Sequence, residues 1–272
     1  MKRQDIEICV LRVAGTNCDS ETKRSFETLG AQAQVIHASE LLEQGRLSKY
    51  DALVFPGGFS YGDYVRAGAI WAKLTLAKLG KELEAFVDEK RLILGICNGF
   101  QVLVEAGLLP GFEGIASYPQ AVLATNIPSG YNCRWVHIKH ESKGKCAFSQ
   151  KIPEKKVLKV PIGHGEGRLM FPKKFEKKFL EQLYENDQLV FRYCYENGNY
   201  AEGCFPTNPN GSFHDIAGIC NPEGTVFGLM PHPERAFYWW QQPDWTRQMH
   251  MSEYGDGRLI FESMLDYLEK KR

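Results

Sequence analysis

The chain has 272 residues, with 33 lysines and arginines against 33 aspartates and glutamates, so its formal net charge is zero. This balance gives no support for nucleic acid or an anionic membrane as a partner, and we expect neither. Apolar residues make up 43% of the sequence and charged residues 24%, as in globular proteins that bury a full core. No apolar run approaches the roughly 18–20 residues of a membrane span, and Met1–Asp5 leads into no signal-type segment. We therefore expect a cytoplasmic protein.

The cysteines form no Cys-x-x-Cys pair and no compact framework, which favours free thiols in a reducing compartment. They are Cys9, Cys18, Cys97, Cys133, Cys146, Cys194, Cys204 and Cys220. Cys133, His137, His140 and Cys146 are residue types that bind zinc, but their spacing matches no common structural site. Residues 134–139 alternate like a strand, so we predict surface histidines there and no bound metal.

Short apolar runs alternate with helical segments through the first 107 residues. Strands are predicted over residues 6–11, 33–36, 51–55 and 91–96. Helices are predicted over residues 17–29, 41–47, 65–87 and 98–107, the third with a possible interruption at Gly80. Thr16 or Asn17 is the expected cap of the first helix, and Gly30 its expected end. This order predicts a doubly wound α/β fold, with a mostly parallel sheet flanked by helices.

The second half of the chain is less regular. Strands are predicted over 135–139, 157–160 and 189–193, a hairpin over 215–230, and helices over 174–184 and 259–268. The glycine-rich segment 162–168 carries a histidine, and we expect a loop whose role the sequence does not define. No repeat or linker divides the chain, so we predict one domain over residues 1–272.

The segment Arg91–Gln101 has the form of a nucleophile elbow. An apolar strand meets Gly95-Ile96-Cys97-Asn98-Gly99, and a helical pattern follows directly. Glycines on both sides of Cys97 allow a sharp turn, and the start of a helix favours a thiolate. A buried, unreactive cysteine is the alternative on this segment alone.

A second glycine-rich segment, Pro56–Asp63, directly follows the predicted third strand. Open α/β sheets place their ligands at this edge, the carboxyl ends of the strands. A phosphate loop is disfavoured because no Gly-Lys-Ser/Thr sequence follows and the G-x-G-x-x-G spacing is absent.

His232 and Glu234 form a candidate pair of base and orienting acid. They are two residues apart, so in extended backbone both side chains point to the same face. Pro231 and Pro233 flank the histidine and disfavour a helix, which predicts that extended form. A carboxylate beside a histidine orients the imidazole and stabilises its charge.

These motifs together resemble a known family. Gly95-Ile96-Cys97-Asn98-Gly99-Phe100-Gln101 is similar to the G-x-C-x-G-x-Q motif of class I (triad-type) glutamine amidotransferases, and His232-Pro233-Glu234 to their His-x-Glu ending. Further motifs resemble the glutaminase subunits of phosphoribosylformylglycinamidine synthases over nearly the whole chain. They lie at residues 56–69, 164–168, 208–212 and 231–235. The chain looks longer than the compact form of that subunit, and we predict insertions around 110–160 and 236–256.

The resemblance implies a role for each matching residue. Cys97 would attack the amide of glutamine, His232 would move protons, and Glu234 would orient His232. Oxyanion and substrate contacts would come from Gly57, Gly58, Asn98 and Gln101, with the backbone N–H groups of Gly58 and Asn98 facing the developing charge. A helix glutamine that faces solvent is the alternative for Gln101.

The resemblance also implies partners. Ammonia from glutamine would pass to a large synthetase subunit that holds ATP, Mg²⁺ and formylglycinamide ribonucleotide, often with a small third subunit; no cofactor is expected on this chain. The aromatic segment 236–245 is a candidate docking surface, or else packs on its own domain. The alternatives are another class I amidotransferase, a stand-alone γ-glutamyl hydrolase, and a non-catalytic regulatory module of the same fold.

Overall fold

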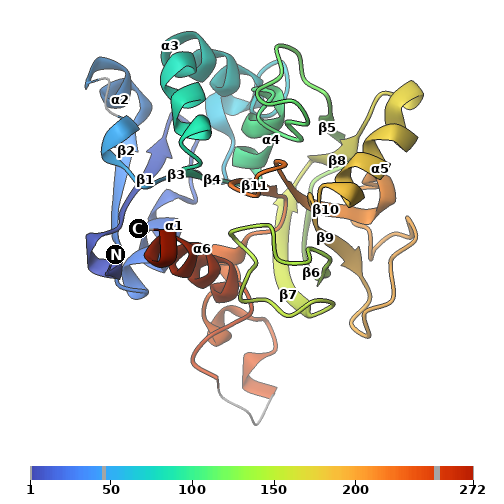
Figure 1. Ribbon diagram of the computed structural model, residues 1–272. Coiled ribbons are helices and arrows are strands. Elements are labelled where there is room, and N and C mark those ends of the chain that lie inside the picture. The colour runs from blue at the N-terminus through green and yellow to red at the C-terminus, as the bar shows by residue number, and fades with distance from the viewer. Residues whose placement is uncertain (1, 45–46, 248–251, 272) are drawn as a thin grey trace.

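The computed structural model describes residues 2–44, 47–247 and 252–271. A nine-stranded sheet with the order β2-β1-β3-β4-β11-β10-β9-β6-β7 forms its centre, and β5 pairs with β8 beside it (Figure 1). The strands are β1 (Glu7–Arg12), β2 (Gln32–His37), β3 (Ala52–Phe55), β4 (Leu92–Ile96), β5 (Val122–Thr125), β6 (Asn132–His140), β7 (Val157–His164), β8 (Glu166–Met170), β9 (Leu189–Cys194), β10 (Ile216–Cys220) and β11 (Val226–Leu229). The α-helices are α1 (Asp19–Thr28), α2 (Ala38–Gln44), α3 (Ala69–Asp88), α4 (Asn98–Glu105), α5 (Glu176–Glu185) and α6 (Arg258–Lys271).

The large sheet has a parallel half and an antiparallel half. Strands β2, β1, β3, β4 and β11 run parallel to one another, whereas β11, β10, β9, β6 and β7 are antiparallel neighbours. The chain moves from β1 to one side to form β2 and then to the other side to form β3 and β4. The predicted doubly wound α/β fold is therefore confirmed, with its reversal of direction between β1 and β3. Ligand sites in such sheets lie at the carboxyl ends of the strands near this reversal.

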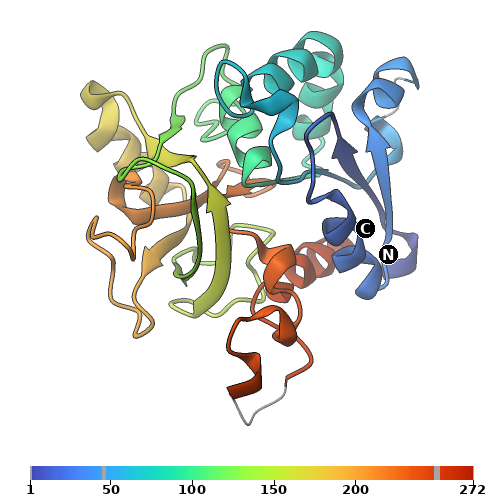
Figure 2. The ribbon, with the colours of Figure 1, turned by 180° about the vertical axis from the view of Figure 1, so that it is seen from behind.

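Helices cover both faces of the parallel half (Figures 1 and 2). On one face α3 and α4 pack together, and the Trp71 ring lies 5.3 Å from that of Phe55 in β3. On the other face α1 lies beside α6, and Phe26 meets Phe261 edge-on at 5.0 Å. Every residue of β3 and β4 is buried, which explains why these strands are continuous apolar runs.

Two details of the predicted helices are wrong. The first helix has Cys18 as its N-cap and no side-chain cap, because the Thr16 hydroxyl instead accepts a hydrogen bond from the N–H of Val13. The helix predicted from Val65 begins only at Ala69, since Val65 has a φ of 72°, and it continues through Gly80 without a break. Gly30, with a φ of 91°, follows the end of α1 as predicted.

The second half of the chain also differs from the predictions in two places. Residues 162–168 are not a loop: β7 ends at His164 and β8 begins at Glu166. The histidines of β6 are not both at the surface, because His140 is buried and its Nδ1 lies 3.1 Å from the carbonyl oxygen of Pro153. The eight cysteines are free thiols, as predicted. Within the described ranges, no helix combines the length and apolar character needed to cross a membrane.

Candidate active site

Cys97 lies in the sharp turn between β4 and α4, which confirms the predicted elbow. Its backbone has φ 51° and ψ −104°, a conformation that a residue with a side chain rarely adopts. The turn is fixed on both sides: the Cys97 N–H donates to the carbonyl of Leu229 at 2.8 Å, and its carbonyl accepts from Gln101 at 3.1 Å. Gly99 is required because a Cβ there would lie 1.8 Å from the Phe55 carbonyl oxygen. The strained turn thus holds the thiol of Cys97 at the carboxyl end of β4.

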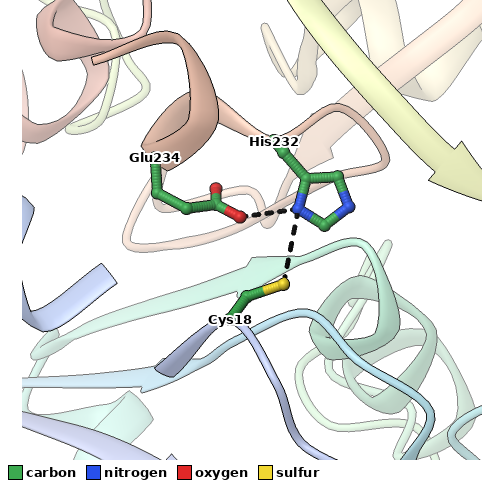
Figure 3. A group of neighbouring side chains, drawn as sticks. All are labelled: Cys18, His232 and Glu234. Carbon is green, nitrogen blue, oxygen red and sulfur yellow. Dashed lines mark hydrogen bonds and ion pairs between the residues drawn. The ribbon is translucent and has the colours of Figure 1, made fainter. Parts of the chain in front are cut away.

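His232 and Glu234 follow β11, the neighbour of β4 in the sheet. His232 Nδ1 lies 2.6 Å from Glu234 Oε1, and both side chains are buried (Figure 3). The His232 N–H also donates to the Pro161 carbonyl at 2.8 Å, which ties this segment to β7. The predicted extended form is wrong beyond His232, because Pro233 starts a 3₁₀ helix that ends at Ala236. The fixed φ of proline suits the first position of a helix as well as an extended chain, and the carboxylate still reaches the imidazole.

The surroundings of His232 hold it as an imidazolium. Burial lowers its pKa, but Glu234 and then Cys97 raise it, and the net pKa is well above its usual value. A buried carboxylate at hydrogen-bond distance favours the charged ring strongly enough to exceed the desolvation penalty. His232 therefore carries a proton that it can give to a leaving amine, and the Nδ1 contact with Glu234 leaves Nε2 for reacting groups.

Cys18, at the carboxyl end of β1, is a residue of this site that the sequence analysis missed. Its Sγ lies 3.9 Å from His232 Nδ1 (Figure 3). It also accepts a hydrogen bond from Arg235 Nη2 at 3.2 Å. Burial raises the pKa of this thiol, against the opposing effect of His232. The sequence carries only a weak signal for it, because Cys18 lies in the loop between the first strand and the first helix, with five residues between it and the end of β1, and no motif surrounds it.

The glycine loop after β3 contacts both cysteine-bearing turns. The Gly57 carbonyl accepts hydrogen bonds from the N–H groups of Asn17 and Cys18, at 3.3 and 3.1 Å. A Cβ at Gly57 would lie 2.6 Å from His232 Cε1 and 3.0 Å from the Cys18 sulfur. Only glycine leaves room there for the imidazole. Gly58 follows with a φ of 150°.

Asn98 and Gln101 connect the elbow to this loop and to β8. Asn98 Oδ1 accepts from the N–H of Ser60 at 3.2 Å, and its Nδ2 donates to Gln101 Oε1 at 2.9 Å. Gln101 Nε2 donates to the carbonyl of Glu166. Gln101 is buried, so the solvent-facing alternative for it is wrong. Oxyanion contacts by Gly58 and Asn98, and substrate contacts by Gly57 and Gln101, remain predictions.

The segment 162–168, whose role the sequence left open, borders Cys97. The carbonyl oxygen of Gly163 lies 3.8 Å from Cys97 Sγ, and Glu166 Oε2 accepts from the N–H of Ala67 at 3.0 Å. His164 is fully buried, and its desolvation, with a smaller effect of cationic His232, lowers its pKa to about 3. Neither ring nitrogen of His164 has a hydrogen-bond partner among the described residues. His164 is therefore a neutral polar side chain within the electrostatic influence of His232.

The aromatic segment after the triad is partly buried and partly exposed. Phe237 is buried in the core, whereas Tyr238 stacks on Trp240 at 4.4 Å and half of Trp240 is exposed. Trp245 is also exposed. Packing on the domain therefore accounts for Phe237, and docking of a partner remains a prediction for the exposed rings.

The site residues come from four segments that are distant in sequence and adjacent in the sheet. Cys18, Gly57, Cys97 and His232 follow β1, β3, β4 and β11, which are consecutive strands of the parallel half. A cysteine on a strained turn, an imidazolium and a buried carboxylate are the groups of a cysteine amidotransferase. In agreement, residues 5–268 match the CobB/CobQ-like glutamine amidotransferase domain, and the chain belongs to this family.

Individual relatives are similar over the same length. The chain is 48% identical to phosphoribosylformylglycinamidine synthase subunit PurQ of Archaeoglobus fulgidus, over 99% of this chain and 100% of that protein. The subunit PurQ of Methanothrix thermoacetophila is 40% identical over 98% of this chain and 100% of its own. Among solved structures, a chain of PurLQS from Thermotoga maritima is 31% identical, with a TM-score of 0.72 and coverage of 97% of this chain and 99% of that one.

Proposed function

We propose that this chain is the glutaminase subunit of a phosphoribosylformylglycinamidine synthase, and that it hydrolyses glutamine to glutamate and ammonia. The observation that carries this proposal is the 48% identity to a PurQ subunit over the full length of both chains. The placement of Cys97, His232 and Glu234 at adjacent strand ends supports the chemistry.

In the proposed reaction, Cys97 Sγ, whose proton has passed to His232, attacks the side-chain amide carbon of glutamine and forms a C–S bond. The backbone N–H groups of Gly58 and Asn98 stabilise the oxyanion. The tetrahedral intermediate breaks its C–N bond, and His232 gives the leaving nitrogen the proton that completes ammonia. His232 then takes a proton from water, and the hydroxide attacks the glutamyl thioester. The C–S bond breaks to release glutamate, and the sulfur of Cys97 and the protonated His232 return to their starting state.

The remaining residues position these groups. Glu234 accepts from Nδ1 and fixes the orientation of the imidazole throughout both steps. Gln101 lies four residues after Cys97 on the first turn of α4, and it contacts the bound glutamine together with Gly57. The hydrogen bonds of Gln101 to Asn98 and Glu166 hold its amide in place before substrate arrives.

The ammonia is used elsewhere, on a separate synthetase subunit that converts formylglycinamide ribonucleotide to formylglycinamidine ribonucleotide with ATP and Mg²⁺. The similar chain from Thermotoga maritima was solved as part of PurLQS, and that name denotes three components. This supports a large synthetase subunit and a small third subunit as the partners of this chain. This chain itself needs no cofactor in the proposed reaction. We place the protein in the cytoplasm, where de novo purine synthesis takes place.

The test is glutamate release from glutamine by the chain alone, and then with a synthetase subunit, ATP and the ribonucleotide acceptor. We expect hydrolysis that depends on the synthetase, and loss of glutamine-dependent product with Cys97→Ser while added ammonia still supports the synthesis. Full activity of the isolated chain would instead favour a stand-alone hydrolase. Hydrolysis retained by Cys97→Ser would contradict the triad.

A further inference from the structure

Cys18, His232 and Glu234 form a cluster that the proposed hydrolysis does not explain. One ligand atom from each residue lies within 4.8 Å of the others, and it is the only such group of three histidine, cysteine or acidic residues found within residues 2–44, 47–247 and 252–271. All three side chains are buried (Figure 3). Hydrolysis needs the contact between His232 and Glu234, but it gives no reason for a thiol on the same side of the imidazole.

The three ligand atoms are the types that zinc prefers. A thiolate sulfur, an imidazole nitrogen and a carboxylate oxygen all bind Zn²⁺, whereas Mg²⁺ and Ca²⁺ prefer sites made of oxygen atoms. We propose that Cys18 Sγ, His232 Nδ1 and Glu234 Oε1 bind a thiophilic divalent metal ion of the zinc class, and that the bound ion inhibits the glutaminase. The inhibitory effect rests on the function proposed above, whereas the binding site rests on geometry alone.

The distances fit such an ion after a small adjustment. Zinc bonds of about 2.0–2.3 Å place the ligand atoms of a tetrahedral site roughly 3.3–3.7 Å apart. Cys18 Sγ and His232 Nδ1 are 3.9 Å apart, close to this range. His232 Nδ1 and Glu234 Oε1 are 2.6 Å apart and must separate when an ion replaces the proton between them. Glu234 Oε2 is buried without a hydrogen bond in the described residues, so no contact of this second oxygen opposes the movement.

The charges of the buried cluster remain balanced when the ion binds. The imidazolium loses its Nδ1 proton and Cys18 loses its thiol proton, so two protons leave as two positive charges arrive. Arg235 Nη2 already donates to the Cys18 sulfur at 3.2 Å, and its Nε lies 3.1 Å from Glu21 Oε1. Such a hydrogen bond to a ligand sulfur is a usual outer-shell contact of a metal site.

Metal binding would inhibit hydrolysis by a specific route. The ion takes Nδ1, the nitrogen through which Glu234 orients the imidazole, and replaces its proton. The Nε2–H that remains then belongs to a neutral ring, and it is a much weaker acid toward the leaving nitrogen than the Nε2–H of an imidazolium. Inhibition would therefore leave Cys97 in place with its thiol chemically intact. The sequence analysis predicted no metal, and this ion is an inhibitor rather than a cofactor.

The test measures metal binding separately from activity. Co²⁺, a spectroscopic probe for zinc sites, is added to the wild-type chain in thiol-free buffer, and its sulfur-to-metal charge-transfer and d–d bands are recorded. The variants are Cys97→Ala, Cys18→Ala and Cys18→Ser. Cys133→Ala, which removes an exposed cysteine on the strand that also carries His137, is the matched control. Circular dichroism of each variant checks that it folds.

We expect tetrahedral Co²⁺ bands in the wild type, Cys97→Ala and Cys133→Ala, and loss of the bands in both Cys18 variants. In the assembled complex, the Zn²⁺ concentration for half inhibition should rise in Cys18→Ala by more than the roughly 10–100-fold typical of outer-shell substitutions. Mg²⁺ at the same concentrations should not inhibit. Bands that persist in folded Cys18→Ala but vanish in Cys97→Ala would overturn the proposal, as would the absence of bands in the wild type. Because the bands need no activity, these outcomes do not depend on the glutaminase assignment.

Discussion

Two turns of the molecule, one between β1 and α1 and one between β4 and α4, each place a buried cysteine at the N-cap of a helix. Cys18 occupies the first turn with φ −104° and ψ 14°, whereas Cys97 occupies the second with φ 51° and ψ −104°. Both thiols are at a helix start that follows a parallel strand. A helix N-terminus alone therefore does not distinguish a nucleophile from its neighbour.

The contacts of the two sulfurs make the difference. Cys18 Sγ donates to Asn17 Oδ1 at 3.3 Å and accepts from Arg235 Nη2. It also lies 3.9 Å from His232 Nδ1. Cys97 Sγ lies 3.8 Å from the Gly163 carbonyl oxygen, and it also interacts with His232, whose pKa it raises. Both sulfurs therefore interact with His232, and Cys18 is in addition held by Asn17 and Arg235.

The largest expected effect separates the two cysteines directly. Cys97→Ala removes the nucleophile and should lower synthetase-dependent glutaminase kcat by at least about 10⁴-fold. Cys18→Ser, the matched variant at the other turn, should lower it by less than about tenfold, since it only loosens packing against His232. Glutamate release at saturating glutamine measures both. If Cys97→Ala and Cys18→Ser both fold and lose kcat to a similar extent, the distinction between the two turns is contradicted.

A second prediction concerns the acid that orients the imidazole. Glu234→Gln keeps the size of the side chain but removes the charge that lies 2.6 Å from Nδ1. We expect kcat to fall by about 10²–10⁴-fold, the scale seen when an orienting acid is lost from a catalytic triad. The KM for glutamine should change little, because Glu234 stabilises the protonated ring rather than the substrate. A large rise in KM with unchanged kcat would show that Glu234 acts in binding.

Gly57→Ala tests the space between the Cys18 turn and His232. The added Cβ would lie 2.6 Å from His232 Cε1, so the ring must move by several tenths of an ångström. Displacement of a catalytic group on this scale can lower kcat by up to about 100-fold. Gly80→Ala in α3 is the control, since nothing lies within 4 Å of its added Cβ and alanine favours a helix. Equal activity of both variants would show that the imidazole has more room than the structure indicates.

The smallest effect is a pH dependence of stability. The folded-state pKa of His232 is well above its usual 6.5, so its ion pair with Glu234 contributes stability that is fully present below about pH 6.5. This contribution is lost as the pH rises through the raised pKa. The difference in Tm between wild type and Glu234→Gln should therefore shrink toward alkaline pH. A difference that is constant from pH 6 to pH 10 would contradict the assignment of His232 as a buried imidazolium.

The parallel half of the fold was predictable because its signals are local. Continuous apolar runs such as Leu92–Ile96 indicate strands buried on both faces, and the glycines around Cys97 mark the turn that follows. The candidate triad residues were named in the same way, since Cys97 and His232 each follow a strand and carry short motifs, and their catalytic roles remain predictions. A short local pattern is enough to predict a buried strand or the residue that follows it, even when the residues that it contacts are distant in the sequence.

The missed features depend on tertiary contacts. Cys18 has no motif of its own, and its place beside His232 follows only from the pairing of β1, β3, β4 and β11. The segment around His164 resembled a glycine-rich loop because its strands are joined by a single residue, Gly165. The 3₁₀ helix at Pro233 was missed because a proline suits both an extended chain and a helix start. In each case the sequence permits several local forms, and packing selects one.

The position of β11 has a consequence for the synthesis of the protein. This strand is the last in the described chain, yet it lies in the middle of the sheet, where Val226 pairs with Ile93 of β4. Leu229, whose carbonyl accepts the hydrogen bond from the Cys97 N–H, is the last residue of β11, and His232 follows three residues later. During synthesis, Cys97 leaves the ribosome long before His232, because the two residues are far apart in the sequence. The pairing of β4 with β11 forms late for the same reason. A site that needs both Cys97 and His232 is therefore incomplete until β11 and the residues that follow it have been made.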